Sequence, residues 1–276
     1  MKFAEDYTPI EMMIIAASRE ITNGQTLMIG TQWPVVVTMF AKRTHAPEIT
    51  IAFEGGIIYD DFPSRIPLLS ADPCLVNGAA LCGDSLDTLG MVLHGGRVDL
   101  AFLSAANVDR YGNINTTCFG DYIRPKYRLG GSGGACDFAC LAPRLIVLLE
   151  HDKKRFPERV DYITSPGYID GCDSRQRAGL RPGTGPYAVY TTLGRFKFDS
   201  IGEMYLDAYY PGVTVEQVRE NMVWELKVSE KVKEMDPPSE ENLKILRKEV
   251  DPFKMYMEEA RANISVFQDY FRLSAT

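Results

Sequence analysis

The sequence predicts an α/β protein built on an open, mixed but largely parallel sheet with helices on its faces. In the first half of the chain, short apolar runs alternate with amphipathic segments, and this β-α-β alternation is typical of parallel strands. Later, the runs 187–192 and 195–198 flank Leu193 and Gly194 as the arms of a hairpin would, which makes the sheet mixed. Ligands of such sheets bind outside the carboxyl ends of the strands, so we expect the functional residues at that edge.

Capping and turn residues set the boundaries of the elements. Thr8, Pro9 and Glu11 offer an N-cap, a proline at the first helical position and a capping-box glutamate, so a helix is expected from there to about residue 21. Thr214 and Gln217 form a second capping box. Buried strands are expected at 25–30, 49–53, 98–103 and 144–150. Further helices are expected at 34–43, 84–94, 135–141, 214–222 and 240–250.

Two segments fall outside this alternation within the single domain that we expect over residues 1–276. Between residues 60 and 78, prolines with polar punctuation predict an irregular excursion. At about 252–272, apolar side chains recur at near-helical spacing and predict a C-terminal helix, packed on the core or on a partner subunit. These side chains are Phe253, Met257, Ala260, Ile264, Phe267 and Phe271.

Composition disfavours several classes of function. A net charge of −7 argues against nucleic acid as a partner, because neutralising phosphates requires a clustered basic surface. No apolar run is long enough to cross a membrane, and the N-terminus lacks the pattern of a signal peptide. The six cysteines contain no C-x-x-C pair and the three histidines are widely separated, so no metal site is expected. Free thiols without a signal peptide suit the cytoplasm.

The most informative residue is Glu54, which ends the apolar run 49–53 and is followed by Gly55 and Gly56. A carboxylate at the tip of a buried strand, with side-chain-free residues beside it, can be approached closely by a large substrate. A carboxylate nucleophile needs this setting. Taken alone, however, the pattern is more often a solvated strand end before a turn.

Two further segments accompany Glu54. They read Asp-Arg-Tyr-Gly-Asn-Ile-Asn-Thr-Thr at 109–117 and Gly-Gly-Ser-Gly-Gly-Ala-Cys-Asp-Phe-Ala at 130–139. Taken in order with Glu54, they resemble the β subunits of family I CoA-transferases, most closely the glutaconate CoA-transferase branch. The similarity covers about residues 8–252. The commoner signature around the family's nucleophile is Ser-Glu-Asn-Gly, whereas this chain has Phe-Glu-Gly-Gly, which is nearer to the glutaconate branch.

The resemblance implies a reaction and a partner. In that family the glutamate attacks an acyl-CoA thioester, giving a mixed anhydride and the CoA thiolate, and then becomes a glutamyl-CoA thioester that exchanges with a second acid. By this resemblance Glu54 is the nucleophile and coenzyme A is a substrate, with no permanently bound cofactor. The family builds its active site from two related halves, and this chain matches the half with the nucleophile. A separate homologous α subunit is therefore expected.

Two alternatives stay open on this scaffold. Some relatives are CoA-thioester hydrolases, carbon–carbon lyases or decarboxylases in which the glutamate is replaced, so the retained Glu54 favours transfer. From a different class, the chain could be a non-catalytic structural subunit that completes a partner's site. A CoA adduct on Glu54 after treatment with acyl-CoA would distinguish transfer from both.

The glycine-rich segment supplies candidate oxyanion donors. It lacks the spacing of the dinucleotide and nucleoside triphosphate loops. Backbone amides at the mouth of a helix can instead hold a thioester oxyanion, and by the resemblance Gly133 and Gly134 are the expected donors. Asn115 is a second candidate, although an asparagine in a turn often satisfies its own backbone.

Two basic clusters are candidates for anion binding. Arg124, Lys126 and Arg128 precede the glycine-rich segment and could contact the phosphates of coenzyme A or a dicarboxylate substrate. Residues 153–155 form the other cluster. Most charge runs are solvated faces, and the sequence does not choose between these readings.

Overall fold

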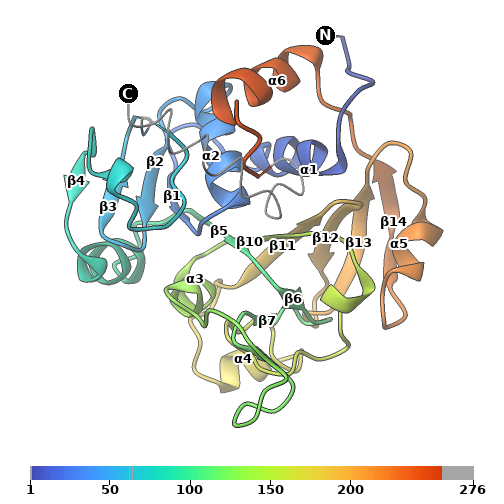
Figure 1. Cartoon of the computed structure of the whole chain (residues 1–276). Coiled ribbons are helices and arrows are strands. Elements are labelled where there is room, and N and C mark those ends of the chain that lie inside the picture. The colour runs from blue at the N-terminus through green and yellow to red at the C-terminus, as the bar shows by residue number, and fades with distance from the viewer. Residues whose placement is uncertain (1, 62, 64, 257–276) are drawn as a thin grey trace.

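The computed structural model describes residues 2–61, 63 and 65–256. One large sheet runs through the molecule with helices on both sides of it (Figure 1). Its strands are β1 (Thr26–Ile29), β2 (Thr50–Phe53), β3 (Ile57–Tyr59), β4 (Leu81–Cys82), β5 (Leu100–Ser104), β10 (Leu145–Leu149), β11 (Pro186–Thr191), β12 (Gly194–Phe198), β13 (Met204–Tyr209) and β14 (Lys227–Glu234). They lie in the order β14-β13-β12-β11-β10-β5-β1-β2-β3-β4.

The middle of the sheet is parallel and its margins are largely antiparallel. Strands β2, β1, β5, β10 and β11 all run in one direction. Strands β12 and β13 on one side, and β3 and β4 on the other, are added antiparallel. The pairing of β11 with β12, in which Val189 lies opposite Phe196, is the predicted hairpin. The predicted fold, an open and largely parallel mixed sheet with flanking helices, is confirmed.

Helices cover both faces of the sheet. Figure 1 shows α1 (Pro9–Ser18), α2 (Trp33–Arg43) and α6 (Glu240–Ile245) on one side, and α3 (Ala135–Leu141) and α4 (Ser174–Arg177) on the other. A further helix, α5 (Val215–Glu220), precedes β14. Both predicted capping boxes, at Thr8 and Thr214, are formed. The remaining helical segments are η1 (Pro73–Leu75), η2 (Leu86–His94), η3 (Lys153–Arg155) and η4 (Leu246–Val250), of which η2 and η4 are π-helical.

Alternation along the strands divides the apolar side chains between two cores. In β1, Leu27 and Ile29 face the core that contains α1 and α2, whereas Met28 faces the core that contains α3. In β10, Ile146 and Val147 divide in the same way. Strands that are buried on both faces read as continuous apolar runs, which is why β1 and β10 were recognisable in the sequence.

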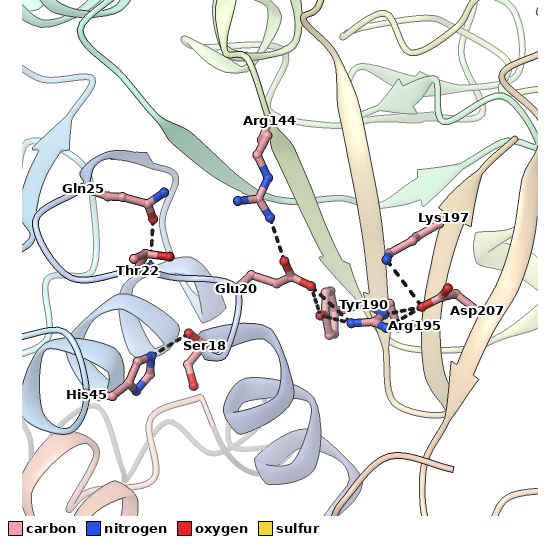
Figure 2. Close-up of polar contacts among 10 residues, drawn as sticks. All are labelled: Ser18, Glu20, Thr22, Gln25, His45, Arg144, Tyr190, Arg195, Lys197 and Asp207. Atoms are coloured by element: carbon pink, nitrogen blue, oxygen red, sulfur yellow. Dashed lines mark hydrogen bonds and ion pairs between the residues drawn. The ribbon is translucent and has the colours of Figure 1, made fainter. Parts of the chain in front are cut away.

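Helix α1 ends at Ser18, before the predicted residue 21, and the following turn carries Glu20 into an ionic network (Figure 2). The Glu20 carboxylate accepts hydrogen bonds from Arg144 at 2.6 Å, from the Tyr190 hydroxyl at 2.8 Å and from Arg195 at 3.2 Å. Arg195 also pairs with Asp207 at 2.5 Å. Because these partners lie on or beside β10, β11, β12 and β13, the network ties the end of α1 to one half of the sheet.

Of the two segments that were predicted to lie outside the β-α-β alternation, the structure agrees with one and differs from the prediction at the start of the other. In its described residues, the excursion between residues 60 and 78 is irregular apart from η1, as predicted. The C-terminal helix was expected to begin at about 252, but residues 252–256 form turns. The reason is Asp251, whose carboxylate accepts the amides of Met255 at 2.8 Å and Tyr256 at 3.0 Å and so bends the chain there. The rest of that predicted helix lies outside the described residues.

Candidate active site

Glu54 follows β2 directly, at the carboxyl ends of the parallel strands where the sequence predicted it. The two glycines after it pack closely against neighbouring backbone. A Cβ on Gly55 would lie 2.6 Å from the carbonyl oxygen of Ser70. Gly56 has φ +98°, and its Cβ would lie 2.5 Å from the Cα of Asp84. Because they have no side chains, these glycines allow two neighbouring backbone segments to approach the end of the strand.

Two donors hold the Glu54 carboxylate, one on each oxygen. The Ser70 hydroxyl donates to Oε1 at 2.9 Å, and the Gly134 amide donates to Oε2 at 2.6 Å. The Thr88 hydroxyl donates to the Glu54 backbone carbonyl at 3.3 Å. Each carboxylate oxygen keeps a second lone pair that these contacts leave available. Sequence reasoning missed Ser70 and Thr88, because neither carries a motif and both are distant from Glu54 along the chain.

The glycine-rich loop contacts Glu54 directly, through a hydrogen bond that the sequence did not indicate. A Cβ on Gly134 would lie 2.6 Å from Glu54 Oε2, so only glycine permits the contact. Two hydrogen bonds with Thr116 hold the loop in place. The Thr116 carbonyl oxygen accepts the Gly131 amide at 2.8 Å, and the Thr116 hydroxyl donates to the Gly131 carbonyl at 2.8 Å. Gly134 thus binds the carboxylate, while the Gly133 amide makes no hydrogen bond to the described residues.

Asn115 does not reach the cavity beside Glu54. Its side chain is fully buried, and its Oδ1 accepts the amides of Thr117 at 2.9 Å and Cys118 at 3.3 Å. Its Nδ2 donates to the Cys118 carbonyl at 2.7 Å. These bonds close a local turn, which is the usual use of an asparagine at such a position. We therefore assign Asn115 to this turn and not to the oxyanion.

The motif at 109–117 is mostly a buried scaffold. The Asp109 carboxylate accepts the Asn113 side-chain amide at 2.9 Å and the Tyr111 backbone amide at 3.0 Å. Asn113 Oδ1 in turn accepts the amides of Gly167 at 2.9 Å and Ile169 at 3.1 Å. Burial raises the pKa of the Asp109 carboxyl despite these hydrogen bonds. The motif therefore joins two loops and supports Thr116, which lines the site.

A cavity of about 430 Å³ opens beside Glu54. Its walls come from the carboxyl ends of β1 and β5, from the glycine-rich loop and from η3. Arg155 is the one cation among the described residues that line it. The lining residues are Gly30, Thr31, Gln32, Glu54, Leu103, Ser104, Ala105, Ala106, Thr116, Leu129, Gly130, Gly131, Ser132, Ala135 and Arg155.

The structure does not bring Arg124, Lys126 and Arg128 to this cavity. They lie on a hairpin formed by β8 (Cys118–Phe119) and β9 (Tyr127–Arg128). The side chains of all three are exposed to solvent. The Arg128 guanidinium lies 4.8 Å from the ring centroid of Tyr122 and donates to the Tyr122 carbonyl at 2.6 Å. Of the two basic clusters, it is the one at 153–155 that reaches the cavity, through Arg155.

Within residues 2–61, 63 and 65–256, no group of three or more His, Cys, Asp or Glu side chains could hold a metal ion. Over the same part of the chain, no helix has the length and apolar character needed to cross a membrane. The chemistry that these residues can perform themselves is that of a positioned carboxylate beside backbone amide donors.

Comparison with known proteins identifies the family. The Coenzyme A transferase family matches residues 10–221. The chain is also similar to the B subunits of two curated CoA-transferases. For glutaconate CoA-transferase of Acidaminococcus fermentans the identity is 38% over 261 residues, covering 92% of this chain and 96% of that protein. For 3-oxoadipate CoA-transferase of Pseudomonas knackmussii it is 38% over 242 residues, covering 87% of this chain and 92% of that protein.

The fold agrees with these matches. The crystal structure of glutaconate coenzyme A-transferase from Acidaminococcus fermentans aligns with a TM-score of 0.86 at 36% identity, over 93% of this chain and 99% of the other. The chain therefore belongs to the coenzyme A transferase family. The predicted resemblance is confirmed, and so is the predicted activity, transfer of coenzyme A, which makes coenzyme A a substrate.

Proposed function

We propose that Glu54 is the nucleophile through which this coenzyme A transferase moves coenzyme A between an acyl-CoA and a carboxylic acid. The observation that carries the proposal is the pair of donors on the Glu54 carboxylate, from Ser70 and Gly134, beside an open cavity. A carboxylate is a weak nucleophile, and its rate of attack depends on being held in a reactive geometry. Two donors from different loops fix its orientation and leave lone pairs for attack.

The reaction is a sequence of acyl exchanges. A Glu54 oxygen attacks the thioester carbonyl, and the CoA thiolate leaves to give a mixed anhydride. The thiolate then attacks the glutamyl carbonyl, which releases the first acid and forms a glutamyl-CoA thioester. The carboxylate of the second acid attacks that glutamyl carbonyl and expels the CoA thiolate, which gives a second mixed anhydride. The thiolate then attacks the acyl carbonyl of this anhydride, forms the new acyl-CoA and expels the Glu54 carboxylate. Glu54 is regenerated as a carboxylate, and no water is consumed.

The glycine-rich loop supports the charge that develops in these steps. Each attack turns a carbonyl oxygen into an oxyanion, which needs fixed donors. The Gly133 amide has no partner within the described residues and is one such donor. Once Glu54 is acylated it loses its negative charge and accepts hydrogen bonds less strongly, so the Gly134 amide becomes the second. The loop thus holds the nucleophile before attack and the oxyanion during it.

We further propose a homologous α subunit as the partner and the cytoplasm as the compartment. The two relatives described above are both named as B subunits, which supports a second subunit. They are named for glutaconate and 3-oxoadipate, which are dicarboxylic acids, so dicarboxylates are the first acids to assay. The cysteines are all unpaired, as suits a reducing compartment.

Mass analysis of the complex after treatment with acyl-CoA tests the nucleophile. A CoA adduct on the peptide that contains Glu54 is expected, together with loss of activity on borohydride reduction and protection by free acid. Glu54→Ala should show neither adduct nor transfer. Release of free CoA without an adduct would favour a thioester hydrolase. Conversion of the acyl group with neither an adduct nor release of CoA would favour a lyase or decarboxylase. An active Glu54→Ala complex would make this chain a structural subunit.

A further inference from the structure

A further cavity, of about 440 Å³, opens at the opposite edge of the sheet from Glu54. It lies beside Pro186, the first residue of β11, and beside Lys197, near the end of β12. Strand β11 runs parallel to β2 through the strands between them, and β12 is antiparallel to β11. Both positions therefore mark the amino ends of the parallel strands, and we call this the amino-edge cavity.

The amino-edge cavity carries an excess of positive charge. Arg175, Arg181 and Lys197 line it, and none of its described lining residues is an aspartate or a glutamate. The whole chain has a net charge of −7, so this local excess runs against the composition of the protein. A cavity lined by charges of one sign concentrates small ions of the opposite sign.

Arg175 places a buried charge in the wall of this cavity. Its side-chain nitrogens donate to the backbone carbonyls of Pro166 at 3.1 Å, of Gly167 at 2.8 Å and of Ala139 at 2.6 Å. A fourth bond, of 2.8 Å, goes to the Thr184 hydroxyl. These acceptors are all neutral, and the buried Nε has no partner among the described residues.

The charge of Arg175 is therefore solvated by dipoles but not neutralised. The residue is 6% exposed, and burial lowers the pKa of its guanidinium, which is nevertheless always protonated in proteins. Buried charges in proteins are normally paired, because an uncompensated charge is costly away from water. An anion in the amino-edge cavity supplies the missing counter-charge at close range.

Two further cations approach the cavity from different elements. Arg181 lies in the loop before β11, and its exposed guanidinium has no hydrogen bond or ion pair within the part of the chain that the structure describes. Lys197 lies 3.8 Å from Asp207, a carboxylate that Arg195 already holds at 2.5 Å (Figure 2). Both cations therefore have N–H groups available for a ligand.

Aromatic rings form another part of the wall. Tyr168 and Phe198 line the cavity with their ring centroids 5.3 Å apart, and the ring centroid of Tyr187 lies 5.7 Å from Lys197 Nζ. A volume of about 440 Å³ is typical of sites for small organic molecules and exceeds what a single inorganic ion needs. The cavity thus suits a ligand that has a carbon skeleton as well as acidic groups.

We propose that the amino-edge cavity binds a small organic dianion, with one acidic group at Arg181, the other at Lys197 and the carbon skeleton against the aromatic rings. Dicarboxylates and phosphorylated carboxylic acids share this chemistry. An ammonium group and a guanidinium form strong, charge-assisted hydrogen bonds with carboxylate and phosphate oxygens. The site is separate from the Glu54 cavity, and the proposal does not depend on the role of Glu54.

Calorimetry on the complex with its α subunit tests this site. Succinate is the dicarboxylate probe, phosphoglycolate is the phosphorylated acid, and sodium chloride keeps the ionic strength constant. Arg181→Ala and Lys197→Met should each weaken the Kd at this site about tenfold, because each removes one charge-assisted contact. Acetate can meet only one of the two cations and should bind at least about tenfold more weakly than succinate. The tighter of the two dianions identifies the class of ligand.

Arg177→Ala is the matched control. It removes the same charge four residues before Arg181, but Arg177 does not line the amino-edge cavity and pairs with Asp173 at 3.1 Å. The Kd should stay within about twofold of that of the unaltered complex. Thermal unfolding gives a second measurement, which also shows that the variants fold. The better dianion should raise Tm in the unaltered complex and in Arg177→Ala more than in Arg181→Ala.

Four results would overturn the proposal. Absence of binding by either dianion would show that the assembled complex has no such site. Binding that is equal in all variants would place the dianion in the Glu54 cavity alone. Inorganic phosphate that bound as tightly as the better dianion would reduce the cavity to a site for a single anionic group. Equal losses in Arg177→Ala and Arg181→Ala would reduce it to a diffuse charge.

Glu54→Ala separates this proposal from the function proposed above. It should abolish the glutamyl adduct and leave binding at the amino-edge cavity unchanged, because Glu54 lies at the other edge of the sheet. Loss of this binding in Glu54→Ala would also contradict the proposal.

Discussion

The hydroxyl of Ser70 donates a hydrogen bond of 2.9 Å to the carboxylate of Glu54 across a sequence separation of 16 residues. Ser70 reaches this position because Asp72, which is only 5% exposed, folds the loop that carries it. The Asp72 carboxylate accepts two hydrogen bonds from Arg65, at 2.8 and 2.9 Å, and the amides of Leu68 and Cys74, each at 3.0 Å. A buried carboxylate thus organises the loop that positions the nucleophile.

Removing the Ser70 hydroxyl should slow acylation of Glu54. Ser70→Ala leaves the Glu54 side chain with one fixed oxygen, so kcat should fall about tenfold while KM for acyl-CoA changes little. Ser70→Thr retains the hydroxyl and should recover most of the rate. Single-turnover formation of the glutamyl adduct measures the step directly.

Ser85→Ala is the control for that prediction. Ser85 is exposed and makes no capping hydrogen bond at the start of η2, so its replacement should not affect the rate. If Ser70→Ala raised KM and left kcat intact, Ser70 would belong to substrate binding and not to the placement of the nucleophile.

Asp72 should make the stability of the fold sensitive to acid. Burial raises the pKa of this carboxyl, but hydrogen bonds from Arg65 and from the Leu68 and Cys74 amides outweigh burial and hold the pKa at about 2, below the usual 3.8. Because the folded-state pKa lies below the unfolded one, the group stabilises the fold above about pH 4, and this contribution is lost as the pH falls towards 2.

Asp72→Asn isolates this contribution. Denaturant unfolding at pH 7 should show a loss of about 2 kcal/mol in the free energy of unfolding, and the gap between the two proteins should close between pH 4 and pH 2. A gap that stays constant over this range would show that the loss comes from packing and not from ionisation.

Gly134 should be irreplaceable for turnover. Its Cβ would lie 2.6 Å from Glu54 Oε2, so Gly134→Ala displaces the carboxylate and disturbs the amide donor. We expect kcat to fall about a hundredfold, with KM for acyl-CoA within about threefold. Gly130→Ala is the matched control from the same loop, since a Cβ there meets nothing within 4 Å. Similar losses in both variants would point to general disorder of the loop.

The sequence predicted the parallel strands and Glu54 for the same physical reason. Strands such as β1 and β10 are buried on both faces and read as apolar runs, and a carboxylate at the end of such a run is conspicuous. Strand β14 was missed because lysines and glutamates occur along its exposed length. Strand β13 was missed although its burial alternates regularly, a pattern that six residues display only weakly.

The contacts of the site were harder to predict than its nucleophile. Ser70 and Thr88 contact Glu54 only because the loops that carry them fold back onto it. No short sequence pattern predicts such a long-range contact. The glycine-rich loop was recognised, but the bond from Gly134 to the carboxylate depends on how two loops meet in space. For Asn115, by contrast, the sequence suggested a contact with the substrate that the structure does not show. Although it belongs to a family motif, its side chain closes its own turn.

The last prediction concerns the partner. The cavity beside Glu54 lies at the carboxyl ends of the parallel strands. The family resemblance implies that a second, homologous half completes the site. We expect the isolated chain to fold, because both faces of its sheet are covered by buried cores. We also expect it to have no appreciable transferase activity, since a carboxylate open to water gains little from desolvation or from a fixed substrate.

Co-expression with a homologous α subunit should restore activity in a complex of equal stoichiometry, measured by light scattering coupled to chromatography. Glu54→Ala should assemble equally well and stay inactive, which separates assembly from chemistry. An isolated chain that transferred coenzyme A at the rate of the complex would contradict the two-subunit reading. In that case the Glu54 cavity would have to exclude water and orient the acyl group with the residues of this chain alone.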